Sequence, residues 1–185
     1  MPSTCLKQKG VMLPIALILL VVISILGIMA MRNATVGEQT INAVRTNAAT
    51  RAAAEMGLRH CEAVVYEISD KPTIPLYAAE AAKIALKGKD GINILTGQND
   101  ANALWTVAAN WKSTSAYRIS MTTANSGFKN PPKCMIEKVK FASGEDGYLI
   151  TSRGIGNEAE YDDSTGLVKS GAEIWLQSVL MPKTS

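Results

Sequence analysis

An uncharged stretch from Val11 to Met31 constrains this chain more than any other feature. At a helical rise of about 1.5 Å per residue it forms a helix of roughly 31 Å, the hydrocarbon thickness of a bilayer. Lys7 and Lys9 precede it without an acidic neighbour, so we expect a cytoplasmic N-terminus and translocation of the rest. A secretory signal has a shorter apolar region and a small-residue cleavage site, which Ile28-Met29-Ala30 does not supply.

Pro14 stands near the front of this stretch and suggests where the chain is cut. Inside a helix, its ring clashes with the carbonyl group four residues earlier, here that of Gly10. A cut after Gly10 removes that carbonyl and leaves Pro14 in the first turn, where no intrahelical hydrogen bond is lost. Val11 is then the new N-terminus. A membrane helix kinked at Pro14 is the alternative.

The remainder of the chain has the composition of one ordinary domain. About 150 residues follow Arg32, enough for a hydrophobic core. Without Lys7 and Lys9, the chain has 17 basic and 16 acidic residues, a net charge of +1. This balance gives no electrostatic footprint for nucleic acid.

Helical periodicity continues beyond the apolar stretch. Apolar residues recur there at spacings of three and four, as on one face of a helix, at Leu58, Cys61, Val65 and Ile68, with Ile41, Val44 and Ala48 continuing the pattern upstream. No proline interrupts before Pro72. We therefore predict one helix from about 12 to 69, half in the membrane and half packed on the domain.

The later part of the chain changes to a period of two, which is typical of strands. Residues 117–122 alternate cleanly, and further strands are expected at 134–141, 148–153 and 173–181, between glycine-bearing turns. Between 70 and 115 the pattern is weak. It suggests some helical spacing at 74–86, then a short helix ending near Trp111 with Asn99 or Asp100 as its N-cap. The predicted fold class is α+β, with the long helix packed on a small antiparallel β-meander.

Three cysteines have different positions in this scheme. Cys5 lies in the head segment and leaves with it if the chain is cut. Cys61 lies on the helix stripe and Cys134 opens a strand, so one cysteine falls in each layer. In an extracytoplasmic domain this arrangement predicts a Cys61–Cys134 disulfide, with two buried free thiols as the alternative.

We expect no catalytic residue, metal ion or cofactor. His60 is the only histidine, but it adjoins Cys61, and neighbours along a helix point apart. The acidic clusters Glu145-Asp146 and 158–163 offer oxygen ligands for calcium but fit no EF-hand loop, so we interpret them as solvated loop tips. The tryptophans are candidate interface anchors at Trp105, Trp111 and Trp175, although core positions are favoured for the last two.

The short basic leader that ends in glycine before an apolar helix resembles the class III signal of type IV pilins and of type II secretion pseudopilins. In that family a prepilin peptidase cuts after the glycine and methylates the new N-terminus. Here the cut would follow Gly10, and Val11 would be the methylated residue. The start of PilX-type minor pilins is similar to two segments of this chain, QKGVMLPIALILLVVISILGIMAMRNAT and RAAAEMGLRHCE. Their strands are similar to CMIEKVKF, YLITSRGIG and EIWLQSVLM. The resemblance implies a pilin-like fold with a leader at 1–10, a membrane and filament-core half-helix at 11–31, and a head at 32–185.

The chain departs from major pilins at one position. They carry a glutamate at the fifth residue of the mature helix, where this chain has Ile15, counted from Val11. That glutamate is thought to pair with the positive amino terminus of a neighbouring subunit in an apolar core, where an unpaired charge is costly. A subunit with Ile15 offers only its own amine, which favours a place at the filament tip. Alternatively, the missing carboxylate only lowers copy number.

The resemblance implies a minor pilin that primes type IV pilus assembly and supports adhesion and twitching motility. Its expected partners are other minor pilins, the major pilin, the prepilin peptidase and a PilY-type tip adhesin, with no nucleic acid. It would lie in the inner membrane first and at the extracellular pilus tip after assembly. The alternatives are a type II secretion pseudopilin and an uncleaved single-pass membrane protein with a periplasmic binding domain.

Overall fold

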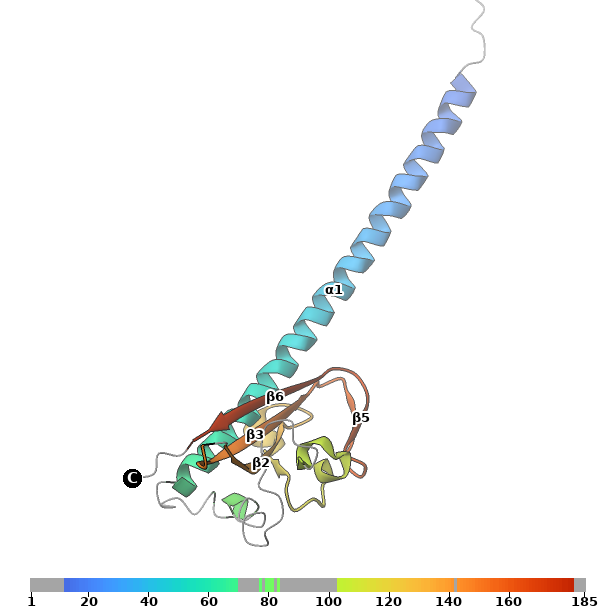
Figure 1. Ribbon diagram of the computed structural model, residues 1–185. Helices are drawn as coiled ribbons and strands as arrows, with labels where there is room; N and C mark the ends of the chain where they lie inside the picture. Colours follow the sequence, from blue (N-terminus) through green and yellow to red (C-terminus); the bar gives the residue numbers. More distant parts are fainter. Residues whose placement is uncertain are drawn as a thin grey trace, which may run out of the picture. The chain divides into compact units, whose positions relative to one another are not determined.

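The computed structural model describes residues 12–69, 77, 79–81, 83, 103–141 and 143–181 (Figure 1). The chain divides into two compact units, Met1–Val44 and Arg45–Ser185. Helix α1 (Met12–Ser69) supplies the described part of the first unit and continues into the second. The predicted helix from about 12 to 69 is therefore confirmed.

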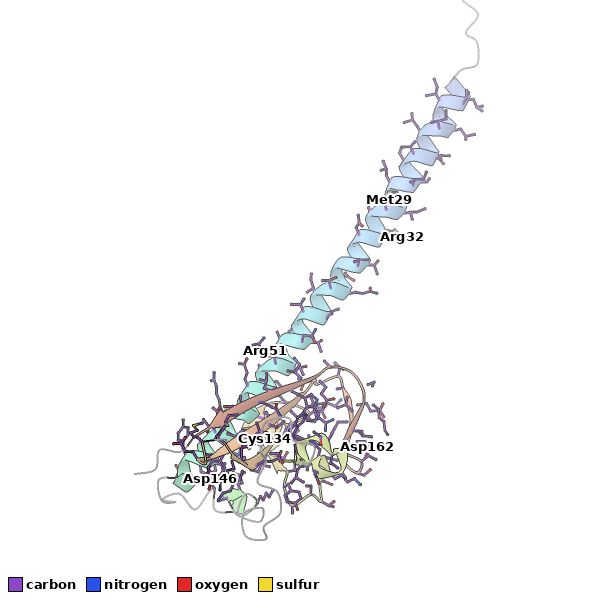
Figure 2. All side chains as sticks on the ribbon, in the orientation of Figure 1. Met29, Arg32, Arg51, Cys134, Asp146 and Asp162 are labelled. Carbon is purple, nitrogen blue, oxygen red and sulfur yellow. A yellow bond between two sulfur atoms is a disulfide. The ribbon has the colours of Figure 1, made fainter. Side chains whose placement is uncertain are left out.

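In the first unit, the side chains of α1 are exposed throughout their described length, from 13 to 44. Figure 2 shows them around the whole circumference of the helix. Ile41 is 68% exposed and Val44 63% exposed, and Ala48 in the second unit is exposed as well. The helical spacing thus continues upstream as predicted, but burial along α1 begins only at Thr50.

The second unit contains an antiparallel sheet with the strand order β1-β2-β3-β6. Its strands are β1 (Ile119–Ser120), β2 (Lys133–Lys140), β3 (Asp146–Ile155) and β6 (Glu173–Leu180). A separate hairpin joins β4 (Glu160–Asp162) to β5 (Leu167–Ser170). The protein is thus α+β, as predicted, and β2, β3 and β6 lie within two residues of their expected bounds.

One face of the sheet packs on the second half of α1. The buried core there combines helix and strand residues, namely Cys61, Val64, Val65, Ile119, Cys134, Ile136 and Ile150, with Leu58 packed against them. Ser152 donates a 2.7 Å hydrogen bond from its hydroxyl to the carbonyl oxygen of Ala54. At Gly154, a Cβ would lie 2.6 Å from the backbone nitrogen of Ala54 and closer still to the carbonyl oxygen of Thr50. Only glycine lets the helix backbone approach the strand so closely.

The opposite face of the sheet carries a second layer that the sequence did not predict. Side chains alternate between faces along a strand, so Glu137 points away from α1. Its buried carboxylate accepts hydrogen bonds from the backbone N–H groups of Leu104, at 2.7 Å, and Trp105, at 3.3 Å. These residues belong to the 3₁₀ turn η2 (Leu104–Thr106), which η3 (Ala108–Trp111) follows.

Two local predictions need correction. One continuous helix was expected to end near Trp111, but its described part consists of the two 3₁₀ turns η2 and η3. The helix is interrupted because Val107, between the turns, is extended (φ −94°, ψ 113°). The predicted N-cap residues Asn99 and Asp100 lie outside the described residues. Of the strand expected at 117–122, only β1 pairs with β2. Thr122 already caps the short helix α3 (Thr123–Ser126), where a plain turn was expected, by accepting a hydrogen bond from the Asn125 N–H.

Candidate functional site

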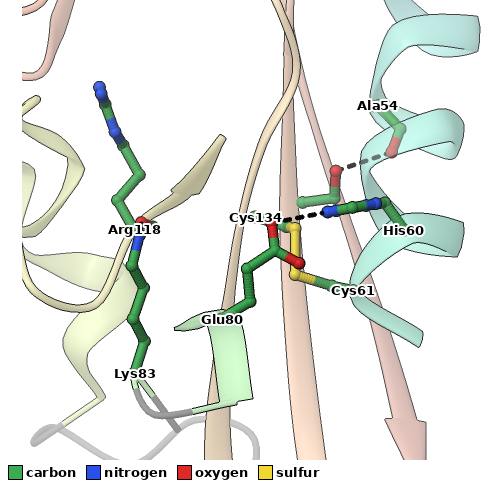
Figure 3. Close-up of a disulfide and its surroundings, with 8 residues drawn as sticks. Ala54, His60, Cys61, Glu80, Lys83, Arg118 and Cys134 are labelled. Atoms are coloured by element: carbon green, nitrogen blue, oxygen red, sulfur yellow. Dashed lines mark hydrogen bonds and ion pairs between the residues drawn. A yellow bond between two sulfur atoms is a disulfide. The ribbon is translucent and has the colours of Figure 1, made fainter. Parts of the chain in front are cut away.

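The predicted disulfide is present between Cys61 on α1 and Cys134 on β2 (Figure 3). The two Cα atoms are 6.3 Å apart and 73 residues separate them in sequence. Both side chains are fully buried in the core between helix and sheet. The bond therefore ties the helix of the globular unit to the centre of its sheet.

His60 lies beside this disulfide but does not face it as a catalytic partner. Its Nε2 is 3.1 Å from Oε1 of Glu80 (Figure 3). Its ring also meets that of Tyr77 edge to face, with ring centroids 5.7 Å apart. Cys61 is oxidised, so it carries no nucleophilic thiol. The contact with His60 instead holds Glu80 near the disulfide, and Lys83 Nζ donates to the Arg118 carbonyl oxygen at 2.7 Å (Figure 3).

The first part of α1 is long and apolar enough to cross a membrane. Its most apolar stretch of 18 residues has a mean hydropathy of 2.9, and none of that stretch is buried within the protein. Ile15 lies in this helix with 50% of its surface exposed. The predicted processing residues are Lys7, Lys9, Gly10 and Val11, which lie outside the described residues.

A concave site in the globular unit gathers the three tryptophans. This site, here the tryptophan cleft, has a volume of about 240 Å³ and includes Trp105, Trp111, Trp175, Thr106, Arg153 and Glu173 in its lining. Trp111 and Trp175 pack edge to face with ring centroids 5.1 Å apart, and Trp105 lies 6.1 Å from Trp175 at a tilt. Trp111 is buried, as predicted, but Trp175 is 39% exposed, which corrects the prediction of a core position.

Arg153 forms the charged floor of the tryptophan cleft. It is only 3% exposed, and its guanidinium carbon lies 4.8 Å from the Trp175 ring centroid and 5.6 Å from that of Trp111. Its Nε donates to Glu173 on β6 and its Nη1 to the carbonyl oxygen of Gly166 at 2.6 Å. Burial of this cation is thus offset by a carboxylate, a carbonyl and aromatic faces.

A second cationic residue, Lys133, is buried next to this floor. Its Nζ lies 4.1 Å from the ring centroid of Tyr161 and donates to the carbonyl oxygen of Pro131 at 3.2 Å. Burial lowers its pKa to about 8, with Asp163 acting in the opposite direction and Arg118 and Arg153 adding to the decrease. Burial also raises the pKa of Tyr161, whose hydroxyl donates to the Trp111 carbonyl oxygen at 2.7 Å.

Two of the acidic residues considered for calcium, Asp162 and Asp163, have partners within the protein. Ser164 holds the pKa of Asp162 well below its usual range by donating to that carboxylate from its hydroxyl and its backbone N–H, with Lys169 assisting. Asp163 pairs with Arg118 at 2.6 Å. In the part of the chain that the structure describes, no group of three or more His, Cys, Asp or Glu residues could hold a metal ion.

Sequence reasoning did not find Arg153, Glu173 or Lys133. Arg153 and Lys133 face each other as neighbours on β3 and β2, and Arg153 is also opposite Trp175 on β6. The available signal was the alternation of side chains along each strand, which places Arg153, Glu173 and Lys133 on the face of the sheet away from α1. Their burial depends on the β4–β5 hairpin, which was not predicted, and on η3, where part of a single short helix was expected.

These features define an α+β protein that combines an apolar N-terminal helix with a disulfide-tied globular unit. Compared with family models, with curated proteins and with solved structures, the chain matches none of them.

Proposed function

We propose that the protein is a minor pilin of the PilX type, which primes type IV pilus assembly and lies at or near the filament tip. The observation that carries the proposal is the uncovered apolar segment of α1, from Leu13 to Met31. Such a surface is unfavourable in water and needs lipid or other apolar helices around it. A pilin helix has both surroundings in turn, the inner membrane before assembly and the filament core afterwards.

The connection between helix and head also supports this function. A filament subunit transmits pulling force from its head to its helix. Here the globular unit is fixed to the second half of α1 by the Cys61–Cys134 disulfide, by the Ser152–Ala54 hydrogen bond and by the close approach at Gly154. A covalent link at this position resists separation of sheet and helix under load.

In the proposed maturation, the prepilin peptidase removes residues 1–10 after Gly10 and methylates the amine of Val11. Lys7 and Lys9 keep the leader on the cytoplasmic side, where this enzyme acts. With Ile15 in place of the glutamate of major pilins, the subunit presents an amine to the next subunit but no carboxylate. It therefore starts the filament, in contact with other minor pilins and a PilY-type adhesin, and supports adhesion and twitching motility.

The proposal is tested by deleting the chain in a piliated host and measuring surface pili, twitching and type II secretion. We expect few pili and little twitching with secretion intact, restored by the wild-type gene. An epitope-tagged copy should be found in sheared filaments, at very low stoichiometry and at their tips. Normal piliation with a loss of secretion would contradict the proposal and favour a pseudopilin.

A further inference from the structure

The tryptophan cleft has no role in the proposed assembly of a filament, although three aromatic side chains and a charged pair converge on it. We propose that it is a binding site for a neutral sugar in its pyranose ring form. The proposal concerns the globular unit alone and does not depend on whether the chain is a pilin.

The aromatic walls supply a stacking surface. Trp111 stands at 85° to Trp175 and Trp105 at 58° to it, so the rings form a corner instead of a closed stack. With 39% of its surface exposed, Trp175 remains accessible beside the buried Trp111. An indole face binds flat apolar surfaces and C–H groups with partial positive charge, such as those on one side of a pyranose ring.

Polar groups at the rim match the hydroxyl groups of such a ring. Glu173 accepts the Arg153 hydrogen bond through Oε1 and keeps 24% of its side chain exposed, so it can accept further bonds from hydroxyl groups. The Thr106 hydroxyl donates to the Ala103 carbonyl oxygen at 2.7 Å, which leaves its own oxygen as an acceptor. Apolar walls with a few convergent polar groups are typical of small-ligand sites.

Charge and polarity disfavour the other ligand classes. A cation would meet the buried Arg153, and an anion would meet Glu173, so either would disturb an ion pair that is neutral as a whole. A purely apolar group, such as a partner's leucine side chain, would remove water from the partly exposed Glu173 carboxylate without replacing its hydrogen bonds. A neutral polyol with one apolar face satisfies both parts of the site.

The volume of about 240 Å³ suits one sugar ring and not an extended chain. A ligand of about a dozen non-hydrogen atoms at ordinary efficiency binds with a Kd of roughly 1–10 mM. We therefore expect weak binding to one residue of a glycan, which multiple copies or neighbouring contacts would strengthen.

The test uses the full chain, purified in a polyoxyethylene detergent because glycoside detergents carry the same ring. Tryptophan fluorescence and ligand-observed NMR saturation transfer are followed with the methyl β-pyranosides of glucose and galactose, N-acetylglucosamine and N-acetylgalactosamine. Glucosamine and glucuronate serve as cationic and anionic comparisons. We expect saturable binding of at least one neutral sugar and weaker binding of the charged ones.

Two variants and one control locate the binding. Trp175→Ala should weaken it by at least about tenfold, whereas Val179→Ala, on the same face of β6 and 42% exposed but outside the cleft, should not change it. Leu167→Arg narrows the cleft at a 51% exposed position and should also abolish binding, without the risk of unfolding a packed residue. Circular dichroism verifies that each variant is folded.

The proposal is overturned if no neutral pyranoside gives saturable binding at concentrations up to about 50 mM, well above the expected Kd. It is also overturned if Leu167→Arg binds as the wild type does, or if an apolar dye or peptide occupies the cleft and no sugar competes with it. None of these results would affect the pilin proposal, which depends on processing and piliation.

Discussion

The sulfur atoms of Cys61 and Cys134 join α1 to β2 across 73 residues of sequence, in the centre of the core between helix and sheet. The bond closes a loop that contains all of residues 62–133, including the parts that form η2, η3 and β1. The stability of the globular unit therefore depends on a covalent link as well as on its packing.

Replacing both cysteines by serine should lower the free energy of unfolding by about 4 kcal/mol in the chain-entropy model, or somewhat less if the unfolded chain is compact. Urea unfolding without reductant measures the change. Cys5→Ser is the matched control and should have no effect, because we expect only Cys61 and Cys134 to be paired. Equal stability of the double variant and the wild type would show that the bond constrains nothing.

The contact at Gly154 gives a second prediction. Gly154→Ala forces a Cβ against the backbone of Thr50 and Ala54 and should destabilise the globular unit by about 1–3 kcal/mol. Gly37→Ala is the control, since nothing lies within 4 Å of the added Cβ and alanine favours helix. The same loss, or no loss, in both variants would contradict the close packing of helix on strand.

The buried Lys133 predicts an unusual dependence of stability on pH. Its pKa is about 8 in the folded protein and about 10.4 in an unfolded chain, so the unfolded state binds more protons between these values. The free energy of unfolding should therefore rise with pH above about 8, by up to about 3 kcal/mol. Near pH 10 the raised pKa of Tyr161 begins to oppose the rise, because the folded state then retains the phenolic proton.

Lys133→Met is the comparison for this prediction, since it keeps an unbranched side chain without a titrating group. The difference in unfolding free energy between wild type and variant should change by up to about 3 kcal/mol from pH 7 to pH 10, in favour of the wild type at high pH. Cys5→Ser is introduced into both the wild-type protein and the Lys133→Met variant, so that no free thiol can exchange with the disulfide at alkaline pH. A difference that stays constant with pH would contradict the buried, desolvated state of Lys133.

Within the pilin proposal, Ile15→Glu supplies the carboxylate of major pilins and should raise the copy number of the protein in filaments several-fold. Quantitative mass spectrometry of sheared pili measures the ratio to the major pilin. Leu17→Glu places the same charge two residues away, where no subunit amine is expected, and should reduce incorporation. Unchanged stoichiometry of the Ile15→Glu protein would show that this position does not decide the place of the subunit.

The sequence predicted the layer that depends on simple periodicity. Cys61 and Val65 lie on one helical stripe, and β2, β3 and β6 follow a period of two, so helix, main strands and disulfide could all be inferred. Burial still could not be inferred for every apolar helix position, since Ile41 continues the same spacing and is exposed.

The second layer was not predictable because long-range polar contacts determine it. The Glu137 carboxylate accepts hydrogen bonds from the N–H groups of Trp105 and Leu104, which precede it by 32 and 33 residues. The turn η2 therefore depends on a distant strand and not on a local cap. The β4–β5 hairpin likewise packs through Gly166, whose φ of 76° places its backbone next to Ala108. The tryptophan cleft between these elements has no local sequence signal.

The most direct test of the central claim is the N-terminal residue of the protein in membranes, measured by intact mass and N-terminal peptide analysis with and without prepilin peptidase. We predict that the mature chain begins at N-methylated Val11 when the peptidase is present and retains residues 1–10 when it is absent. A chain that keeps its leader in both strains would contradict the proposal that the protein is a pilin.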